Sequence, residues 1–150
     1  MSGVKMNEEL REVRPEDCKL LFEWANEKEV RKNSFSSAEI SYEEHKEWFQ
    51  RLLSREDCKQ YIYCVDGIDV GQVRVSINGE NAEIGYSICS DKRGYGYGKS
   101  MIELLKKRIK EDVPQVQVLV AKVKTENIAS HKVFVGLGYE EKYRQYELML

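Results

Sequence analysis

Two dipeptides that favour β-hairpin turns divide the middle of the chain into three runs rich in β-branched and aromatic residues. Asp66-Gly67 separates the runs 60–65 and 68–77, and Asn78-Gly79 precedes the run 82–89. Each dipeptide places a residue that tolerates positive φ beside a glycine, which suits the tight turns that join antiparallel strands. The sequence therefore predicts a three-stranded antiparallel meander.

Helical patterns precede this meander. Pro15 stands where the first turn of a helix accepts proline, and apolar residues then recur at helical spacing. Ser41 and Glu44 form a capping box that starts a second amphipathic helix. On its apolar stripe we expect His45 to be a structural histidine with a satisfied hydrogen bond. The serine-rich segment 31–40 between the two helices is predicted to be a loop.

Patterns of helix, strand, helix and strand follow the meander. A helix is predicted over residues 101–109, and the apolar run 116–123 is typical of a strand covered on both faces. Asn127 is suited to cap a last helix, and Gly138 to stop it. The segment 143–150 is predicted to be a closing strand.

The fold class that these elements predict is mixed α/β. With a short strand at 10–13, we expect a mainly antiparallel mixed sheet of about six strands flanked by about four helices. A length of 150 residues suits one domain, here 1–150 with its core at about 10–150.

Composition narrows the function classes. The net charge of −2 does not favour non-specific nucleic-acid binding, which needs a basic surface. The four cysteines form no C-x-x-C pair and only two histidines are present, so we expect no metal site. No signal peptide or long apolar run is seen, which predicts a cytoplasmic protein with reduced thiols and no membrane contact.

The segment that connects the meander to the next helix carries alternating glycines, in Arg93 to Gly98. Such glycines let successive backbone N–H groups point into one concavity, and the following helix adds its unpaired N-terminal N–H groups. Lys92, Arg93 and Lys99 add positive charge. The segment therefore predicts a site for phosphate or pyrophosphate.

Two common phosphate-binding motifs fail here by one residue each. A P-loop would need glycine at Arg93, and a dinucleotide fingerprint would need glycine at Lys99. Neither motif normally follows an antiparallel meander. Hydrolase chemistry has no support, because no serine–histidine–acid or cysteine–histidine signature is present.

The remaining pattern, R-x-x-G-x-G between a strand and a helix, resembles the pyrophosphate-binding motif of the GNAT N-acetyltransferases. The preceding AEIGYSI resembles that family's fourth strand, and NIASHKVFVGLGY at 127–139 resembles its N-x-x-S/A-x-x-[VL]-[YF]-x-x-x-G-[FY] motif. The order of elements agrees over about 10–150. The resemblance implies acetyl-CoA as cofactor. It assigns cofactor binding to Ile88, Cys89, Ser90, Arg93, Gly94, Tyr95, Gly96, Tyr97, Gly98, Lys99, Ser100, Asn127, Ser130 and Phe134.

The resemblance also implies a mechanism, in which an amine attacks the thioester directly within a ternary complex. Backbone N–H groups near Ile88 would polarise the carbonyl, and Glu83 stands where histone-acetylating members carry the general base. Strand alternation places Glu83 on one face with Gly85, Ser87 and Cys89. Many members carry a tyrosine acid at the position of Phe134, which has no hydroxyl. The acid is unassigned, with Ser130 as a weak substitute.

The N-terminal half resembles bacterial enzymes that acetylate amino groups of nucleotide-linked sugars, such as the enzyme of the pseudaminic acid pathway. On that resemblance Trp24, Asn26, Arg31 and Asn33 are predicted to bind the acceptor. Trp24 also suits the helix core, and Arg31 also suits an ion pair. Polyamines, antibiotics and protein N-termini are alternative acceptors. A non-catalytic acyl-CoA-binding module is the alternative from another class, and a homodimer is an expected assembly.

Overall fold

The computed structural model describes residues 6–150. The meander that the turn signals predict is present, and it forms the centre of a sheet in the strand order β1-β2-β3-β4-β5. The elements along the chain are β1 (Glu8–Glu12), η1 (Pro15–Asp17), α1 (Cys18–Ala25), α2 (Lys28–Asn33), α3 (Tyr42–Ser54), β2 (Cys58–Val65), β3 (Ile68–Asn78), β4 (Asn81–Ile88), η2 (Ser90–Lys92), α4 (Tyr97–Asp112), β5 (Val118–Ala121) and α5 (Ile128–Gly136).

The first four strands pair antiparallel, and β5 joins β4 in parallel. Asp66 and Gly67 both have positive φ, 51° and 81°, as a tight turn between twisted strands requires. The β4–β5 ladder is short, since it runs from Asn81–Val118 to Ile84–Ala121 and goes no further. Beyond Ile84 the two strands therefore separate.

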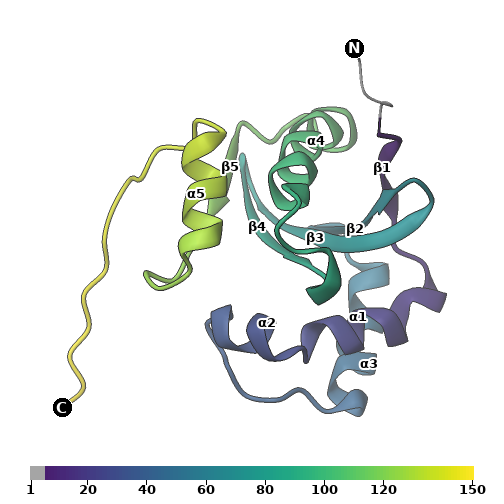
Figure 1. The fold of residues 1–150 in the computed structure, drawn as a ribbon, viewed down its shortest axis with the longest axis horizontal. Helices are drawn as coiled ribbons and strands as arrows, with labels where there is room; N and C mark the ends of the chain where they lie inside the picture. Colours follow the sequence, from purple (N-terminus) through teal and green to yellow (C-terminus); the bar gives the residue numbers. More distant parts are fainter. Residues whose placement is uncertain (1–5) are drawn as a thin grey trace.

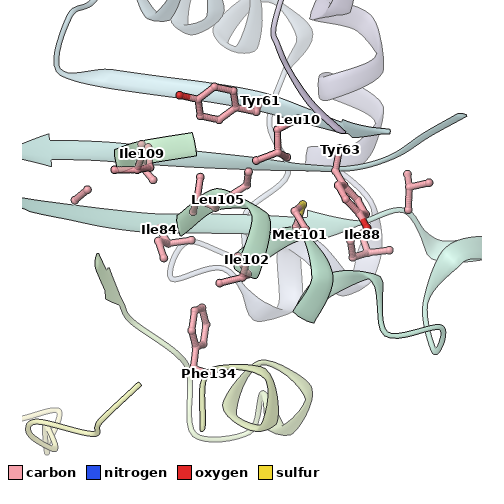
Figure 2. Close-up of a cluster of buried hydrophobic side chains, with 14 of the residues drawn as sticks. Leu10, Tyr61, Tyr63, Ile84, Ile88, Met101, Ile102, Leu105, Ile109 and Phe134 are labelled. Carbon is pink, nitrogen blue, oxygen red and sulfur yellow. The ribbon is translucent and has the colours of Figure 1, made fainter. Parts of the chain in front are cut away.

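Helices cover both faces of the sheet (Figure 1). On one face α4 packs the apolar side of its helix, including Met101 and Leu105, onto strand residues such as Tyr63 (Figure 2). On the other face α1 and α3 pack Leu21 and Phe49 against the alternate residues of β2. This alternation follows from the two-residue period of a strand, and it divides the apolar residues into two cores.

The predicted helix caps, the helix stop at Gly138 and the structural role of His45 are confirmed. Ser41 Oγ accepts from Glu44 N at 3.2 Å, and Asn127 Oδ1 accepts from Ser130 N at 3.2 Å, so both predicted caps are present. Gly138 has a φ of 88° just after α5, as the predicted stop requires. His45 is buried, and its Nε2 donates to the Cys18 carbonyl at 2.9 Å.

Two predictions at the chain's polar and C-terminal segments are wrong. The predicted loop 31–40 begins inside α2, because Glu27 caps a short helix by accepting from Val30 N. Residues 143–150 form no strand and extend away from the body (Figure 1). Alternation creates the potential for a strand, but a strand also needs a hydrogen-bonding partner.

The counts of elements change accordingly. Five strands are present rather than about six, and five α-helices rather than about four, within residues 6–150. The predicted strand 116–123 shortens to β5, whose residues are exposed or half-buried rather than covered on both faces. The fold class itself, mixed α/β with a mainly antiparallel sheet, is confirmed. No helix of the described residues is long and apolar enough to cross a membrane.

Candidate active site

A cleft of about 1210 Å³ lies where β4 and β5 separate. It extends from the glycine loop at the start of α4 to the face covered by α1 and α3. Residues 83–88 of β4 line the cleft, and α5 contributes Ser130 and Phe134. The separation of the strands thus brings the glycine loop and the predicted acceptor helices to one continuous space.

The glycine loop has the backbone that the sequence predicts. Gly94 and Gly96 adopt φ of 85° and 79°, and Gly96 is the N-cap of α4, a helix of 16 residues. Only glycine adopts such angles without strain, and the space beside both residues is open. Lys92 and Lys99 also line the cleft. Exposed N–H groups, a helix N-terminus and two cations fit the pyrophosphate of coenzyme A.

The predicted role of Arg93 in reinforcing the loop's charge is not seen. Its guanidinium forms an ion pair with Glu27 at 2.7 Å, and its Nε donates to the Ile88 carbonyl at 3.1 Å. The hydrogen bond from Arg93 lowers the pKa of Glu27. Arg93 therefore ties the glycine loop to the beginning of α2, and its positive charge is balanced there.

The two tyrosines of the loop differ in exposure. Tyr95 is 70% exposed and stacks on Tyr97 with ring centroids 5.8 Å apart. Tyr97 begins α4 and meets Tyr63 edge-on, so it packs into the core. Ser100 follows in the first turn of α4 and is half-buried. Of these residues, Tyr97 lines the cleft.

The end of β4 carries the next predicted cofactor residues. Ile88 is buried and lines the cleft, whereas Cys89 and Ser90 lie just beyond the strand. Cys89 N donates to the Val70 carbonyl at 2.9 Å. Burial and a hydrogen bond to Asp91 raise the pKa of the Cys89 thiol to about 11, so this thiol stays protonated at neutral pH.

A tyrosine that the sequence reading did not assign lies against α5. The hydroxyl of Tyr86 is 2.7 Å from Ser130 Oγ, and its ring meets Phe134 edge-on at 5.9 Å. All three residues line the cleft, and Asn127 lines it one turn earlier in the chain. The signal was available: alternation along β4 places Tyr86 on the face opposite Glu83, towards α5. A hydroxyl is therefore present beside Phe134, supplied by β4.

Glu83 lies on the acceptor face of β4 together with Gly85 and Ser87, as alternation predicts. Cys89, predicted to share this face, lies beyond the end of the strand. The Glu83 side chain is 48% exposed, and its carboxylate is 3.0 Å from the ammonium of Lys122. A charged residue of a sheet commonly pairs in this way, and the pairing leaves the Glu83 carboxylate open to the cleft.

The four predicted acceptor residues divide into two pairs. Trp24 and Asn33 line the cleft, and Trp24 also packs against the core between α1 and α3. Asn26 instead bonds both backbone groups of Ile40, at 2.6 and 2.8 Å. Arg31 lines the cleft, but its guanidinium donates to the carbonyls of Ala25, Ser36 and Ala38, and not to the acidic side chains considered as partners.

Polar residues from the middle of the sheet also reach the cleft, and sequence reasoning missed them. Gln60 Nε2 donates to Gln72 Oε1 at 2.8 Å, and Gln72 Nε2 donates to Ser87 Oγ at 3.1 Å. Arg74 lies beside this row, with its guanidinium 4.9 Å from the ring of Trp48. The inward-facing polar residues of the predicted strands were the available signal. Within residues 6–150, no cluster of three or more metal-ligating side chains is found.

Comparison with known proteins agrees with this arrangement. The chain matches the family described as Acetyltransferase (GNAT) domain over residues 9–140. A domain from Methanocaldococcus jannaschii DSM 2661 is similar at a TM-score of 0.82 and 26% identity, covering 95% of this chain and 94% of that chain.

Two further solved structures have the same fold at lower identity. Spermidine N-acetyltransferase from Vibrio cholerae, in complex with CoA and spermine, has a TM-score of 0.85 at 16% identity, covering 95% of this chain and 86% of that chain. Aminoglycoside acetyltransferase AAC(6')-Ib, in complex with coenzyme A, has a TM-score of 0.77 at 17% identity, covering 91% and 86%.

A search among curated protein sequences finds no match. The family match nevertheless spans most of the chain, and it includes the glycine loop, β4 and α5, which together form one wall of the cleft. The chain therefore belongs to the GNAT family of acetyl-CoA-dependent acetyltransferases.

Proposed function

We propose that this protein transfers acetyl from acetyl-CoA directly to the primary amine of a small molecule, an amino sugar carried on a nucleotide. One observation carries the proposal: a single cleft joins the glycine loop to the face of β4 that bears Glu83. Both reactants therefore have room to meet at β4 without a covalent enzyme intermediate. Holding them together in this way supplies much of the rate enhancement.

Residues of β4 are suited to position the reaction. Between Gly85 and Ile88 the strand has no ladder partner on the side of β5. Apart from the Ile88 carbonyl, which accepts from Arg93 Nε, backbone groups on that side can pair with an extended ligand and polarise a carbonyl oxygen. Bound acetyl-CoA supplies a thioester, whose carbon accepts the attacking amine.

Two side chains move the protons. The Glu83 carboxylate takes a proton from the amine, which is mostly protonated at neutral pH when free. Glu83 passes this proton to solvent, and the neutral nitrogen then forms its bond to the thioester carbon as the carbon–sulfur bond breaks. The nitrogen gives its second proton to the freed Glu83 carboxylate, which leaves a neutral amide. The Tyr86 hydroxyl, beside Ser130, gives a proton to the departing sulfur and regains one from solvent. This assignment fills the role that Phe134 cannot perform.

The acceptor proposal is supported by Trp24 and Asn33. Both line the cleft on the side of α1 and α2, where an aromatic ring and an amide can contact a sugar or a base. Asn26 and Arg31 are engaged with backbone groups, so they support this surface by shaping it.

The test is release of free thiol from acetyl-CoA across amino sugars, their nucleotide-linked forms, polyamines and amino-terminal peptides. We expect acceptor-dependent release that is strongest for the nucleotide-linked amino sugars. In Glu83→Gln we expect the rate at neutral pH to fall about 100-fold, because a general base typically contributes 10²–10⁴. Coenzyme A binding with no release from any acceptor would favour a non-catalytic acyl-CoA-binding module.

We also propose that two copies associate through the C-terminal segment 143–150. Tyr143, Tyr146 and Leu148 are exposed there, and β5 is the last strand of the sheet, so its outer edge is open. An apolar extended segment can pair with such an edge of a second copy. Light scattering should give a dimer for the full chain and a monomer after deletion of 143–150. A monomeric full chain would contradict the proposal.

A further inference from the structure

Arg74 projects from β3 into the acceptor side of the cleft. Its guanidinium lies over the ring of Trp48, 4.9 Å from the ring centroid, and one nitrogen is 3.9 Å from the position of a Cβ on Gly85. The side chain is thus held flat between α3 and β4. Arg74 lies in van der Waals range of the Gly85 position.

Among residues 6–150, no hydrogen bond or ion pair reaches the Arg74 guanidinium, and this distinguishes it from the arginines that tie the fold together. Arg11 pairs with Asp17, Arg93 with Glu27, Arg108 with Asp112, and Arg31 with backbone carbonyls. Glu83 lies on the neighbouring strand, but Lys122 pairs with it. Burial lowers the pKa of Arg74, which reflects a cation removed from water.

A second polar group beside Arg74 also lacks a partner. Gln60 is directly opposite Arg74 in the β2–β3 register, and its Oε1 is buried without a hydrogen bond among the described residues. An unpaired buried acceptor costs about 1–3 kcal/mol. The two neighbours together offer one acceptor and a set of cationic donors at the same place in the cleft.

A cation partly removed from water without a partner destabilises a folded protein, so the half-buried, unpaired Arg74 in a cleft points to a ligand. A guanidinium that stacks on an aromatic ring keeps its N–H groups free in the plane of the group. Those donors match the two oxygens of a carboxylate or phosphate.

We propose that Arg74 binds an anionic group of the acceptor, so that the substrate is an amine that also carries a carboxylate or a phosphate. Arg74 pairs with Gly85 across the strands, two residues from Glu83. Two residues of a strand span about 7 Å, which limits how far the anionic group lies from the reacting amine. The inference rests on the proposed function, because Glu83 defines where that amine binds.

The first experiment compares acceptors that differ by the anion alone. Ornithine against putrescine tests the carboxylate, and glucosamine 6-phosphate against glucosamine tests the phosphate. For at least one pair we expect kcat/KM to favour the anionic member by roughly 10- to 150-fold, the range for hydrogen bonds to a charged group. Arg74→Gln should abolish the preference, Arg74→Lys should retain part of it, and Arg14→Gln, at an exposed arginine outside the cleft, should leave it unchanged.

The second experiment needs no turnover. Tryptophan fluorescence, with Trp48 as the adjacent reporter, is followed as acetate or inorganic phosphate is added to protein saturated with coenzyme A. We expect a saturable response that disappears in Arg74→Gln. Failure to bind coenzyme A would count against the proposed function, whereas an anion response lost in Arg74→Gln would still support this inference. A response equal in both proteins, or absent in both, overturns it.

Thermal unfolding separates a binding role from a structural one. If Arg74 only supported the fold, its replacement would lower the melting temperature. We expect Arg74→Gln without ligand to melt no lower than the wild-type protein, because the change removes an unpaired charge that is half-buried. A clearly lower melting temperature would assign Arg74 to the fold and contradict the proposal.

Discussion

The two sides of the cleft are built differently. The side proposed for the cofactor consists mostly of consecutive residues, from the end of β4 through the glycine loop into α4, and the groups proposed to bind the cofactor are largely backbone N–H groups. The side proposed for the acceptor consists of side chains from separate elements: Trp24 of α1, Trp48 of α3, Arg74 of β3 and Glu83 of β4. One side depends on local conformation, and the other depends on how the elements pack.

This difference determines which changes each side tolerates. Backbone groups cannot be exchanged by substitution, so the cofactor side is sensitive to residues that set φ and insensitive to most side chains. The acceptor side is the reverse, because each contributing side chain can be replaced while the backbone of its helix or strand stays in place. A family that keeps one cofactor and varies its acceptors is consistent with such a division.

The largest expected effect tests the cofactor side. Gly96→Val places a β-branched residue at a φ of 79°, where strain costs about 1–3 kcal/mol. The loop must shift to relieve this strain, and losing about 1–3 kcal/mol of binding free energy lowers an affinity by about 5- to 150-fold. We expect coenzyme A affinity to fall about 100-fold, measured by calorimetry.

The matched control is Gly79→Val in the β3–β4 turn. Gly79 also has positive φ, 62°, but it does not line the cleft. The change should lower stability similarly and leave coenzyme A affinity within about 2-fold, as for a surface change away from the site. Equal losses of affinity in both variants would show that general destabilisation, and not loop geometry, explains the first result.

The next effect concerns Tyr86, where the cofactor side does use a side chain. Tyr86→Phe removes the hydroxyl that meets Ser130 and retains the ring contact with Phe134. We expect kcat to fall about 10-fold, less than the 10²-fold or more typical of acid catalysis because a thiol leaves readily, with little change in KM. Steady-state kinetics on the preferred acceptor measure both parameters.

The pH dependence distinguishes this role from a structural one. Burial raises the pKa of Tyr86 above its ordinary value near 10, although the Ser130 hydrogen bond opposes the shift. The phenol is therefore protonated at pH 7 and at pH 9, and the loss in Tyr86→Phe should be equal at both. A loss confined to pH 7 would contradict the assignment, and Ser130→Ala should give a smaller loss of the same kind.

The same division explains how much the sequence predicts. The glycine loop, the hairpin turns and the caps at Ser41 and Asn127 follow from residues within a few positions of one another, and all are present. Arg74 could not be found in this way, because its unpaired state depends on α3, β2 and β4 packing around it. The segment 143–150 failed for a related reason: its alternation does not specify a partner edge.

Asn26 shows that packing can also engage a residue that the sequence predicts to bind the acceptor. Both ends of its amide bond the backbone of Ile40, which fixes the loop after α2. We expect Asn26→Ala to lower the free energy of unfolding by about 2 kcal/mol, since partly buried backbone partners are left unsatisfied. Asn33→Ala should change it by less than about 0.5 kcal/mol and should raise the acceptor KM. Urea unfolding and kinetics compare the two, and the opposite ranking would return Asn26 to the substrate site.

The smallest expected effect separates the two sides by pH. His45 is buried under the acceptor helices, where burial lowers its pKa despite the hydrogen bond to Cys18. The unfolded state therefore binds the proton more readily, and stability is full above the ordinary histidine pKa near 6.5 and declines as pH falls below it. Between pH 7.5 and 5.5 the free energy of unfolding should fall by no more than about 1.4 kcal/mol. This limit corresponds to the one pH unit below the ordinary histidine pKa.

His45→Gln should remove that part of the pH dependence, whereas His131→Gln, at the exposed histidine of α5, should retain it. Because His45 packs against Trp48 and Phe49, its protonation loosens α3 and not the glycine loop. We therefore expect the acceptor KM to rise at pH 5.5 while coenzyme A affinity stays constant. If acid weakened acceptor binding and coenzyme A binding equally, the two sides would unfold as one cooperative unit. The two sides would then differ in how they are built but not in their stability.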